Sequence, residues 1–425
     1  MIHTVKYFLK TYGCQMNVYD SHIIRQILNT EGMVEVSQPH LADVIIVNTC
    51  AVRAHAENRA ISWVKQVRKN GQRVGIVGCV AGFEREKLID KGIADFVLGP
   101  DHYSMLPSAI EGKIQIAVEP TDETYSSIYA RQMRGSSSFV AIMRGCNNFC
   151  SYCVVPYIRG RERSRSPERI IDEVKKLVDK GIKEVILLGQ NVNSYTYNHY
   201  KFPDILEKVA LVPGVVRVDF TASHPKDISP MLFDVMKHYP NIARHLHLPV
   251  QSGSNKVLKL MGRKYTKEDY LKIIEQARSK VKDISITTDI LVGFPGETDG
   301  DYLETIEMVK YVRFDFAYMF YYSPRHNTLG ALLPGLIPEK ERKKRLQNLI
   351  DIQNKITYEK NREMLEKIYI VIVQGKSKTG EWLGTTPQQK TVIFKGKTKV
   401  GELTTVYVQK LSGWTPYGIQ VQGGA

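Results

Sequence analysis

The sequence FVAIMRGCNNFCSYC, residues 139–153, decides the fold because an apolar run leads directly into three closely spaced cysteines. The run FVAIM has the length and composition of a buried strand. Cys146, Cys150 and Cys153 follow it with C-x3-C-x2-C spacing. In parallel β/α folds, the loops at the carboxyl ends of the strands hold the chemistry. This stretch therefore predicts a cysteine site on the loop after the first strand of such a fold.

Five further strand-like runs follow this loop, and helical periods separate them. The runs are EVILLG (184–189), VVRVDFT (215–221), HLHLPV (245–250), DISITTDILVG (283–293) and FAYMFYY (316–322). The first connecting helix is predicted at 166–181, where Ser166 can cap it and Gly181 can end it. Six β/α units predict a partial parallel (β/α)6 barrel, which a long charged helix at 338–367 closes.

The region before the barrel has its own cysteine pattern. Three apolar runs that each end in a cysteine alternate there with helical periods, at residues 7–14, 42–50 and 73–79. Such alternation predicts an α/β domain of parallel strands, in which the strand ends meet at one edge of the sheet. We therefore expect Cys14, Cys50 and Cys79 to converge, although they lie far apart along the chain.

The last 58 residues, from Ile368, contain short β-type runs and no helical pattern. Short β-type runs separated by Gly, Lys, Ser and Thr predict a small barrel of about five strands. Seven Lys against two Glu in this segment favour RNA binding, with a dimerisation or purely structural barrel as the alternative. The predicted fold class is α/β, with a linker of polar and small residues at 121–138. The predicted domains are an N-terminal three-cysteine domain (1–120), a parallel β/α barrel (139–367) and a small β-barrel (368–425).

Composition limits the possible classes of protein. The 425 residues are 43% hydrophobic and 24% charged, which excludes fibrous and wholly disordered chains. The net charge of +15 favours a polyanionic partner such as nucleic acid. The start of the chain has no signal-peptide pattern and no apolar run reaches the ~18 residues of a membrane span, so we expect a cytoplasmic protein without membrane contact.

In a reducing compartment, six cysteines indicate metal binding or catalysis before disulfides. Zinc sites usually take four ligands in two C-x2-C pairs or with histidines, and neither arrangement is present. Three thiolates in one tight loop suit three corners of a [4Fe–4S] cluster whose fourth iron stays open. An open iron indicates chemistry rather than electron storage.

A C-x3-C-x2-C loop at the start of a β/α barrel resembles the radical S-adenosylmethionine superfamily. Within it, six segments are similar to the methylthiotransferase family: TYGCQMN (11–17), NTCAVRAHAENR (48–59), GCNNFCSYCVVPYIRGRERSR (145–165), SHPKD (223–227), HLPVQSGS (247–254) and TTDILVGFPGET (287–298). The resemblance implies two [4Fe–4S] clusters, one on each cysteine trio, with all six cysteines catalytic, and a C-terminal TRAM domain that binds RNA. It further implies insertion of sulfur and a methyl group at adenine C2 of N6-isopentenyladenosine beside the anticodon of tRNA.

The resemblance also implies contacts to S-adenosylmethionine on the strand-end loops. The expected residues are Gly189, Gln190, Asn191, Asn193, Ser223, Gln251, Gly293 and Glu297. The alternative is that the glycines only allow the chain to turn after a strand, without any contact to a cofactor. The other expected partners are tRNA and a low-potential electron donor such as flavodoxin or ferredoxin, and we expect a monomer.

Basic residues beyond the barrel cysteines and in the last domain are candidates for contacts to RNA phosphates. These residues are Arg159, Arg161, Arg163, Arg165, Lys376, Lys378, Lys395, Lys397 and Lys399. Salt bridges are the alternative for the arginines, since Glu162, Glu168 and Asp172 are close along the chain, and a solvated surface is the alternative for any one lysine.

Other functions stay open at this point. The substrate could be threonylcarbamoyladenosine in tRNA or a ribosomal protein, or the chain could be an iron–sulfur RNA-binding regulator without turnover. The sequence also departs from the family pattern in two places. Residues 326–328 read His-Asn-Thr where Pro-Gly-Thr is common, and 385–394 lack the family's acidic loop.

Overall fold

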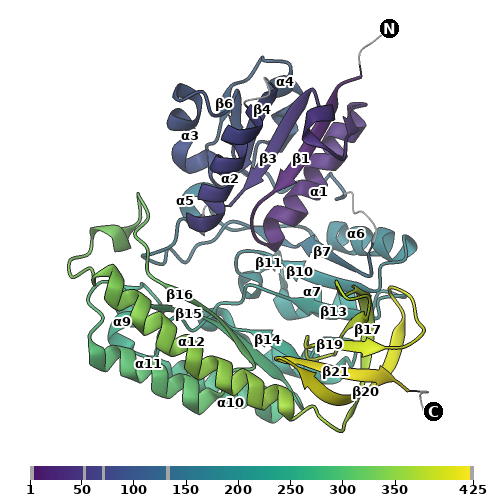
Figure 1. Ribbon diagram of the computed structural model, residues 1–425, viewed down its shortest axis with the longest axis vertical. Helices are drawn as coiled ribbons and strands as arrows, with labels where there is room; N and C mark the ends of the chain where they lie inside the picture. The colour runs from purple at the N-terminus through teal and green to yellow at the C-terminus, as the bar shows by residue number, and fades with distance from the viewer. Residues whose placement is uncertain (1–3, 51–53, 69–71, 131–134, 422–425) are drawn as a thin grey trace.

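The computed structural model describes residues 4–50, 54–68, 72–130 and 135–421. The chain forms an α/β layer with the N-terminus, a parallel barrel beneath it and a small β-barrel beside the parallel barrel (Figure 1). The predicted fold class is confirmed. No helix among the described residues combines the length and the apolar character needed to cross a bilayer.

The N-terminal sheet has six strands that are parallel throughout, in the order β2-β1-β3-β4-β5-β6. Its strands are β1 (Lys6–Thr11), β2 (Val34–Glu35), β3 (Val44–Thr49), β4 (Arg73–Gly78), β5 (Phe96–Leu98) and β6 (Ile116–Ala117). The associated helices are α1 (Gln15–Thr30), α2 (Ala54–Arg68), α3 (Ala81–Asp90) and α4 (Leu106–Ile110). Because every residue of β3 is buried, a continuous apolar run was needed there.

The central domain is a partial barrel of six parallel strands, as predicted. They are β7 (Ser137–Ala141), β10 (Glu184–Leu188), β13 (Arg217–Phe220), β14 (His245–His247), β15 (Ser285–Val292) and β16 (Phe316–Tyr321). β7, β10 and β13 pair in one group and β14, β15 and β16 in another. A parallel bridge from Val218 to Ile242 continues the first group toward the second.

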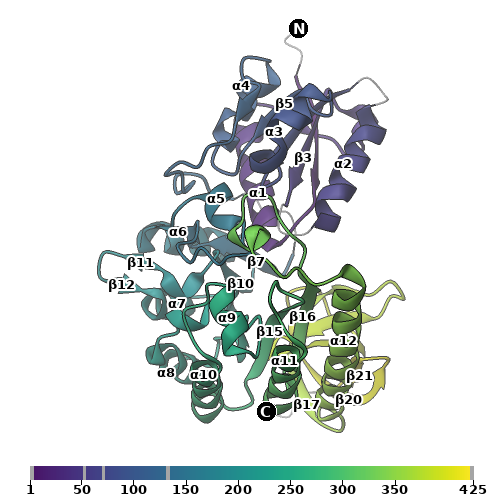
Figure 2. The ribbon, with the colours of Figure 1, turned by 90° about the vertical axis from the view of Figure 1, so that its left-hand side faces the viewer.

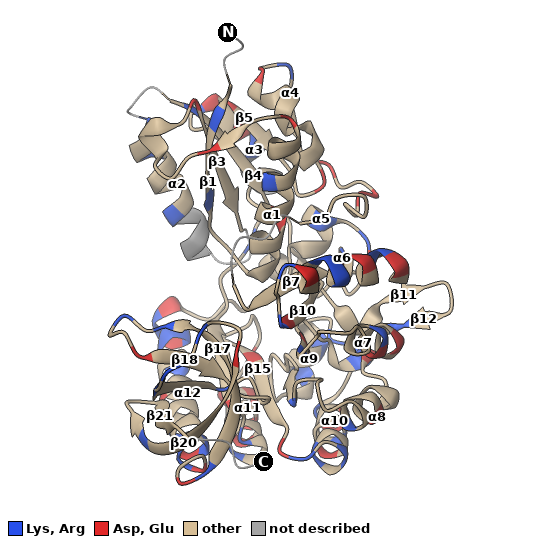
Figure 3. Ribbon diagram, turned by 90° about the vertical axis from the view of Figure 1, so that its right-hand side faces the viewer, with Lys and Arg blue, Asp and Glu red and all other residues tan. Residues whose placement is uncertain are grey.

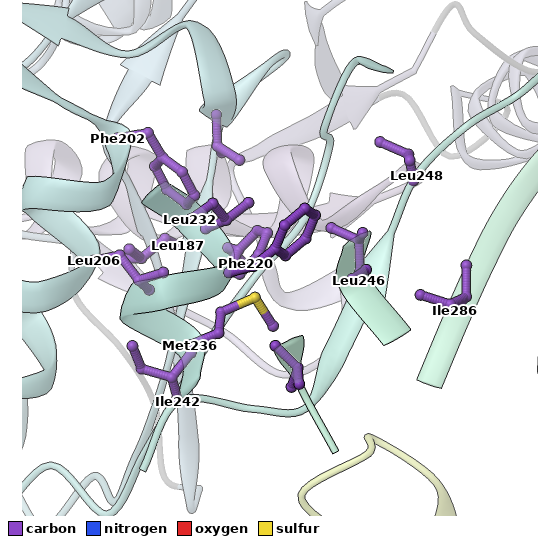
Figure 4. Close-up of a cluster of buried hydrophobic side chains, with 14 of the residues drawn as sticks. Leu187, Phe202, Leu206, Phe220, Leu232, Met236, Ile242, Leu246, Leu248 and Ile286 are labelled. Atoms are coloured by element: carbon purple, nitrogen blue, oxygen red, sulfur yellow. The ribbon is translucent and has the colours of Figure 1, made fainter. Parts of the chain in front are cut away.

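Helices cover the outside of this barrel (Figures 1 and 2). They are α6 (Pro167–Asp179), α7 (Phe202–Ala210), α8 (Pro230–His238), α9 (Asn255–Leu260), α10 (Lys267–Lys280), α11 (Asp299–Val312) and α12 (Glu339–Arg362). The predicted helix at 166–181 is confirmed: Ser166 Oγ accepts a hydrogen bond from Arg169 N at 3.4 Å, and Gly181 beyond the helix has φ +89°. Figure 4 shows the core, where α7 and α8 pack on the barrel strands.

Short elements complete this region. The cysteine loop lies between β8 (Met143–Arg144) and α5 (Val155–Arg159), β9 (Arg163–Ser164) pairs with β8, and β11 (Thr196–Tyr197) pairs with β12 (Tyr200–Lys201). Turns of 3-10 helix lie at Pro39–Leu41, Tyr103–Met105, Val192–Ser194, Pro225–Asp227 and Leu329–Leu332.

The C-terminal domain is a closed five-stranded barrel in the order β17-β18-β19-β21-β20, which confirms the predicted small barrel. Its strands are β17 (Ile368–Lys376), β18 (Trp382–Thr385), β19 (Thr391–Lys395), β20 (Leu403–Ser412) and β21 (Thr415–Gln420). Alternate apolar residues fill it, including Val371, Val373, Phe394 and Val406. Closure leaves no free sheet edge.

This barrel is attached to the amino ends of the parallel strands. Glu184, the first residue of β10, accepts hydrogen bonds from Arg217 Nε at 2.6 Å, Gln389 Nε2 at 2.7 Å and Gln374 Nε2 at 2.9 Å. Arg217 Nη1 donates to Thr386 O at 2.7 Å. The segment 385–390, which departs from the family pattern, is therefore part of an interface between domains.

The segment predicted as a linker contains structure. Tyr125 is buried, its ring stacks on that of Tyr103, and its hydroxyl donates to Pro100 O at 3.1 Å. β7 already begins at Ser137, and residues 131–134 lie outside the described part of the chain. A buried aromatic ring thus anchors the first part of this segment to the N-terminal domain.

Candidate functional site

Three thiols lie together at one edge of the N-terminal sheet. Cys14 is the N-cap residue of α1, Cys50 follows β3 directly, and Cys79 follows β4 directly. A hydrogen bond with Cys50 is the main reason that the pKa of Cys14 falls to about 6. Burial raises the pKa of Cys79, and the charge of Cys14 adds to this rise. Cys50 therefore acts on Cys14, and Cys14 acts on Cys79, although the three thiols follow different strands.

A pair of asparagines fixes this cysteine edge. Asn17 Oδ1 accepts hydrogen bonds from Cys14 N at 3.3 Å and from the Cys14 thiol at 3.4 Å. Asn17 Nδ2 donates to Asn48 Oδ1 at 3.1 Å and to Thr49 O at 3.0 Å. Gly78 has φ +90°, and a Cβ there would lie 2.5 Å from Asn48 Oδ1. The backbone at all three strand ends is thus held around two buried amides.

The second trio occupies the loop between β8 and α5. Cys153 N donates to Cys150 O at 2.9 Å, and Cys146 N donates to Gly160 O at 3.1 Å. Burial raises the pKa of Cys146 to about 11 and the pKa of Cys153 to about 12. The charge of Cys150 contributes to both shifts, so the three thiols are close neighbours.

Arg263 is the cation of this second trio, and the sequence analysis missed it. Its Nη1 donates to Cys150 Sγ at 3.5 Å, its Nη2 to Pro249 O at 2.8 Å and its Nε to Tyr265 Oη at 2.9 Å. The side chain is buried. Arg263 is 110 residues from Cys153 along the chain, so no spacing rule could have revealed the contact.

The donor sets fit iron–sulfur clusters. Buried thiols with raised pKa values need a cation to become ligands, because a metal ion stabilises the thiolate. Among the described residues, no three His, Cys, Asp or Glu side chains approach as closely as the ligands of one metal ion. A four-iron cube holds its thiolates further apart than one ion does, and three thiolates leave one of its irons open.

Buried polar atoms without hydrogen-bond partners occur in the cysteine loop and on the loops after β10 and β13. Within the part of the chain that the structure describes, they include Asn148 Oδ1, Asn191 Oδ1, Asn193 Oδ1 and Ser223 Oγ. Asn148 lies in the cysteine loop, and the others follow β10 and β13. Since buried polar groups are normally satisfied, these atoms fit the polar groups of a ligand such as the methionine part of S-adenosylmethionine.

Three other predicted cofactor residues support the loops. A Cβ at Gly189 would lie 2.5 Å from Met143 Cγ, so glycine is required where the second strand passes β8. Gln190 Oε1 accepts from Gly145 N, next to the first cysteine of the loop. Gln251 has φ +70° and bonds the backbone of β15 through Asp289 O at 2.9 Å. Their contacts with a cofactor stay predictions.

The turn at 293–297 is held by an ion pair between Glu297 and Arg345. The Glu297 carboxylate accepts from Gly293 N at 2.9 Å and pairs with Arg345 Nη1 at 2.6 Å. A Cβ at Gly293 would meet the Arg342 side chain at 2.4 Å. Glu297 therefore fixes the turn against α12, and the predicted contact of its carboxylate with the cofactor stays a prediction.

Two of the four arginines predicted to contact RNA are buried in ion pairs, and a third, Arg163, is partly buried in one. The pairs are Arg159 with Asp20, Arg163 with Asp101 and Arg165 with Glu173. These ion pairs favour the alternative of salt bridges, although the carboxylates differ from the nearby ones expected. Contacts of these three arginines with RNA stay predictions.

Arg161 and the lysines remain available. Arg161 is exposed and its guanidinium lies 4.4 Å from the Phe149 ring centroid. Lys376, Lys378, Lys395, Lys397 and Lys399 are also exposed. Lys376 Nζ lies 4.8 Å from the Trp382 ring centroid, and Trp382 donates to Gly396 O at 3.2 Å, which connects the two lysine-bearing turns. Figure 3 shows basic residues on the loops of this barrel.

Curated relatives match the chain over almost its entire length. The protein from Thermodesulfovibrio yellowstonii is 42% identical over 95% of this chain and 96% of its own length. The protein from Parabacteroides distasonis is 43% identical over 98% of this chain and 96% of its own length. Both are named tRNA-2-methylthio-N6-dimethylallyladenosine synthase. The chain belongs to this synthase family.

Family models and solved structures agree with the architecture of this synthase family. The radical SAM superfamily matches residues 140–309, and "Uncharacterized protein family UPF0004" matches residues 6–99. The radical S-adenosylmethionine methyltransferase TsrM from Kitasatospora setae has a TM-score of 0.57 at 14% identity, covering 74% of this chain and 73% of its own. The cobalamin-dependent radical enzyme OxsB has a TM-score of 0.53 at 11% identity, covering 81% of this chain and 56% of its own. At these identities the likeness shows the fold alone.

Proposed function

We propose that this chain is a radical S-adenosylmethionine tRNA methylthiotransferase. It converts N6-dimethylallyladenosine (isopentenyladenosine) beside the anticodon to its 2-methylthio derivative. The observation that supports this function is identity of 42–43% with synthases of that name over 95–98% of the chain. Two separate cysteine trios at strand ends agree with a reaction that needs two metal centres.

The residues present would hold the cofactors in two places. Cys146, Cys150 and Cys153 would hold one [4Fe–4S] cluster, and Cys14, Cys50 and Cys79 would hold the other. The unpartnered atoms of Asn191, Asn193 and Ser223 would receive polar groups of S-adenosylmethionine. When bound, these cofactors supply the one-electron chemistry, the sulfur and the methyl group that side chains cannot provide.

The chain itself contributes position and shielding. Val154 and Ile158, beside the second trio, are buried in the same apolar cluster as Cys79 of the first. The two cysteine sites therefore share an apolar, buried boundary. Arg263 and Asn17 hold one cysteine of each trio in place.

The exposed basic residues are the proposed contacts with tRNA. Arg161 and the exposed lysines of the C-terminal barrel would contact tRNA phosphates, with a salt dependence that reflects their number. We further propose a cytoplasmic monomer that takes electrons from a low-potential donor such as flavodoxin or ferredoxin. The proposed domains keep the boundaries 1–120, 139–367 and 368–425.

The test is anaerobic reconstitution with iron and sulfide, followed by dithionite, S-adenosylmethionine and tRNA that bears dimethylallyladenosine. Mass spectrometry of nucleosides should show the 2-methylthio product. Cys150→Ala should abolish both S-adenosylmethionine cleavage and product, whereas Cys50→Ala should abolish the product alone. tRNA with threonylcarbamoyladenosine is the matched control, and its modification in preference to the first substrate would overturn the assignment.

A further inference from the structure

Helix α5 brings a residue of the barrel segment to the N-terminal cysteines. It begins two residues after Cys153 and lies between the N-terminal sheet and the barrel (Figure 2). Its apolar face packs with Cys79 in one buried cluster. Arg159, the last residue of α5, is 3% exposed. The segment that holds one cysteine trio therefore ends in a buried cation beside the other trio.

The charges around Arg159 do not balance within the protein. Arg159 Nη2 donates to Asp20 Oδ2 at 2.8 Å, and Arg144 binds the other oxygen of the same carboxylate. Tyr103 Oη also donates to Asp20 Oδ2, at 3.1 Å. Two buried guanidinium groups thus share one carboxylate. Arg159 Nη1 is buried and has no hydrogen-bond partner among the described residues.

The thiolates of the N-terminal cysteine trio would supply the negative charge that balances Arg159. Ile158, the neighbour of Arg159 in α5, is buried in the same apolar cluster as Cys79. Asp20, which binds Arg159, lies on α1, whose N-cap residue is Cys14. Cysteines that bind metal do so as thiolates. A loaded site would place negative charge next to the surplus cation, where an unpaired buried charge is otherwise strongly unfavourable.

We propose that Arg159 is a positioning residue that raises the reduction potential of the iron–sulfur cluster held by Cys14, Cys50 and Cys79. The inference rests on the proposed function, because it presumes that cluster. Reduction adds one electron, so a fixed positive neighbour stabilises the reduced form. Since Arg159 comes from the barrel segment, the N-terminal cluster acquires its working potential only in the assembled molecule.

An ordinary ion pair between domains is the competing explanation, and the same interface offers a control. Arg163, also from the barrel segment, pairs with Asp101 of the N-terminal domain at 2.9 Å. It is not among the influences that shift the pKa of Cys14 or Cys79. Replacement of Arg163 removes this pair and the hydrogen bond from Arg163 Nη1 to Arg159 O at 3.1 Å, so it disturbs the same interface but keeps the Arg159 guanidinium.

The experiment uses the full chain with Cys146, Cys150 and Cys153 replaced by Ala, so that one cluster remains. Electron paramagnetic resonance during a potentiometric titration with dithionite measures the ratio of reduced to oxidised cluster. Arg159→Gln should lower that ratio about tenfold at a fixed potential, equal to about 59 mV for one electron. Asp20→Asn should raise the ratio of reduced to oxidised cluster above that of the parent. Arg159→Lys, which keeps the positive charge, should give a ratio close to that of the parent, and Arg163→Gln should leave the ratio unchanged.

An unchanged ratio in Arg159→Gln, with four irons still bound, overturns the inference. An equal shift in Arg163→Gln also overturns it, because the interface and not the charge would then be responsible. If Arg159→Gln does not fold, the opposite-sign variant Asp20→Asn decides, since it removes the carboxylate but keeps both arginines. Failure of the parent chain to bind iron at all instead contradicts the proposed function.

Discussion

Asn17 links a cysteine to two neighbouring strand ends through one buried amide. It accepts from Cys14 and donates to Asn48 and to Thr49 O. An amide offers two donors and an acceptor with two lone pairs, so it can hold several strand ends at once. A hydrogen bond with Cys50, together with the backbone N–H groups of Asn17 and Met16, makes the Cys14 thiol unusually acidic.

The acidity of Cys14 predicts selective alkylation in the metal-free protein. Its pKa is lowered to about 6, so at pH 7 most of this thiol is thiolate, the reactive form. The rate of reaction with iodoacetamide at Cys14 should fall about tenfold per pH unit below that value. Peptide mass spectrometry should find Cys14 labelled before Cys79, which is buried and has a raised pKa.

The control for this prediction is Cys50→Ala. It removes the hydrogen bond that lowers the pKa of Cys14 most, so half-maximal labelling should move to higher pH. Equal rates at Cys14 in the parent and the variant would show that Cys50 does not stabilise the thiolate.

At this scale the cysteines could be predicted and their charged neighbours could not. Spacing along the chain and position after strands identify the cysteines, because both are local properties. The partners of Arg159 and Arg165 depend on which distant carboxylates the fold brings to them. Alternating arginines along a chain therefore looked like an exposed basic stripe, although the fold buries most of it.

Helices α9 and α11 begin at a shared carboxylate. Asp301 Oδ2 accepts from Thr298 N at 2.8 Å and from Lys256 Nζ at 2.9 Å, and Oδ1 accepts from Ser254 Oγ at 2.7 Å. Thr298 and Ser254 are the N-cap residues of the two helices. One side chain therefore couples both helix starts beside the turn at 293–297.

Asp301→Ala should destabilise the protein by about 3 kcal/mol, because it removes several hydrogen bonds to a charged acceptor. Thermal unfolding and faster hydrogen exchange in Asp299–Val312 would measure the loss. Burial raises the pKa of Asp301, but the hydrogen bonds from Thr298, Lys256 and Ser254 outweigh it and hold the pKa well below its usual range.

The sign of the pH dependence follows from this lowered pKa. A carboxylate with a lower pKa in the folded state stabilises the protein above its unfolded pKa of about 3.9. That stability is lost as the pH falls through the folded pKa. The difference in stability between the parent and Asp301→Asn should therefore be constant from pH 7 to about 5 and shrink below about pH 4; a constant difference at pH 3 would contradict the assignment.

The strands of both barrels and β1, β3 and β4 of the N-terminal sheet could be predicted, because apolar runs of strand length ended at clear turn residues. Seven strands, most of only two residues, gave no such run: β2, β5, β6, β8, β9, β11 and β12. The linker at 121–138 could not be recognised as partly ordered. Its composition is polar, and Tyr125 is one aromatic residue without a periodic pattern around it. Its burial depends on Tyr103 and Arg144, which belong to two different domains.

Over the whole molecule, the two functional regions lie at opposite ends of the parallel strands. The barrel cysteines and unpartnered polar atoms follow the carboxyl ends, whereas the C-terminal barrel contacts the amino ends. The sequence predicted both regions but not this opposition. The interface depends on Glu184 and Arg217, which look like ordinary charged residues at strand starts.

The lysines of the C-terminal barrel should control the salt dependence of tRNA binding. Replacing Lys376, Lys395 and Lys397 by Gln should weaken binding and reduce the slope of log affinity against log salt by about 2–3. Filter binding at several salt concentrations measures this slope. The charge-matched control replaces three exposed lysines elsewhere: Lys237, Lys272 and Lys282. An equal effect of the control would mean that net charge alone is responsible.

The attachment of the C-terminal barrel can be tested at Glu184. Glu184→Gln leaves the buried Arg217 without its charged partner, which is expected to cost about 3–5 kcal/mol at the interface. Hydrogen exchange should rise in residues 385–390 and stay unchanged in β19. Glu402→Gln, at an exposed ion pair with Lys399, is the matched control and should change neither segment.

The position of the C-terminal barrel at the amino ends has a consequence for the choice of RNA. An RNA that touches the lysines and also presents a nucleotide to the carboxyl-end loops must extend along the full length of the parallel strands. A hairpin too short to span these strands can occupy either place but not both at once. The path between the two contacts therefore sets a minimum length for an RNA that makes both, independently of any base that the protein reads.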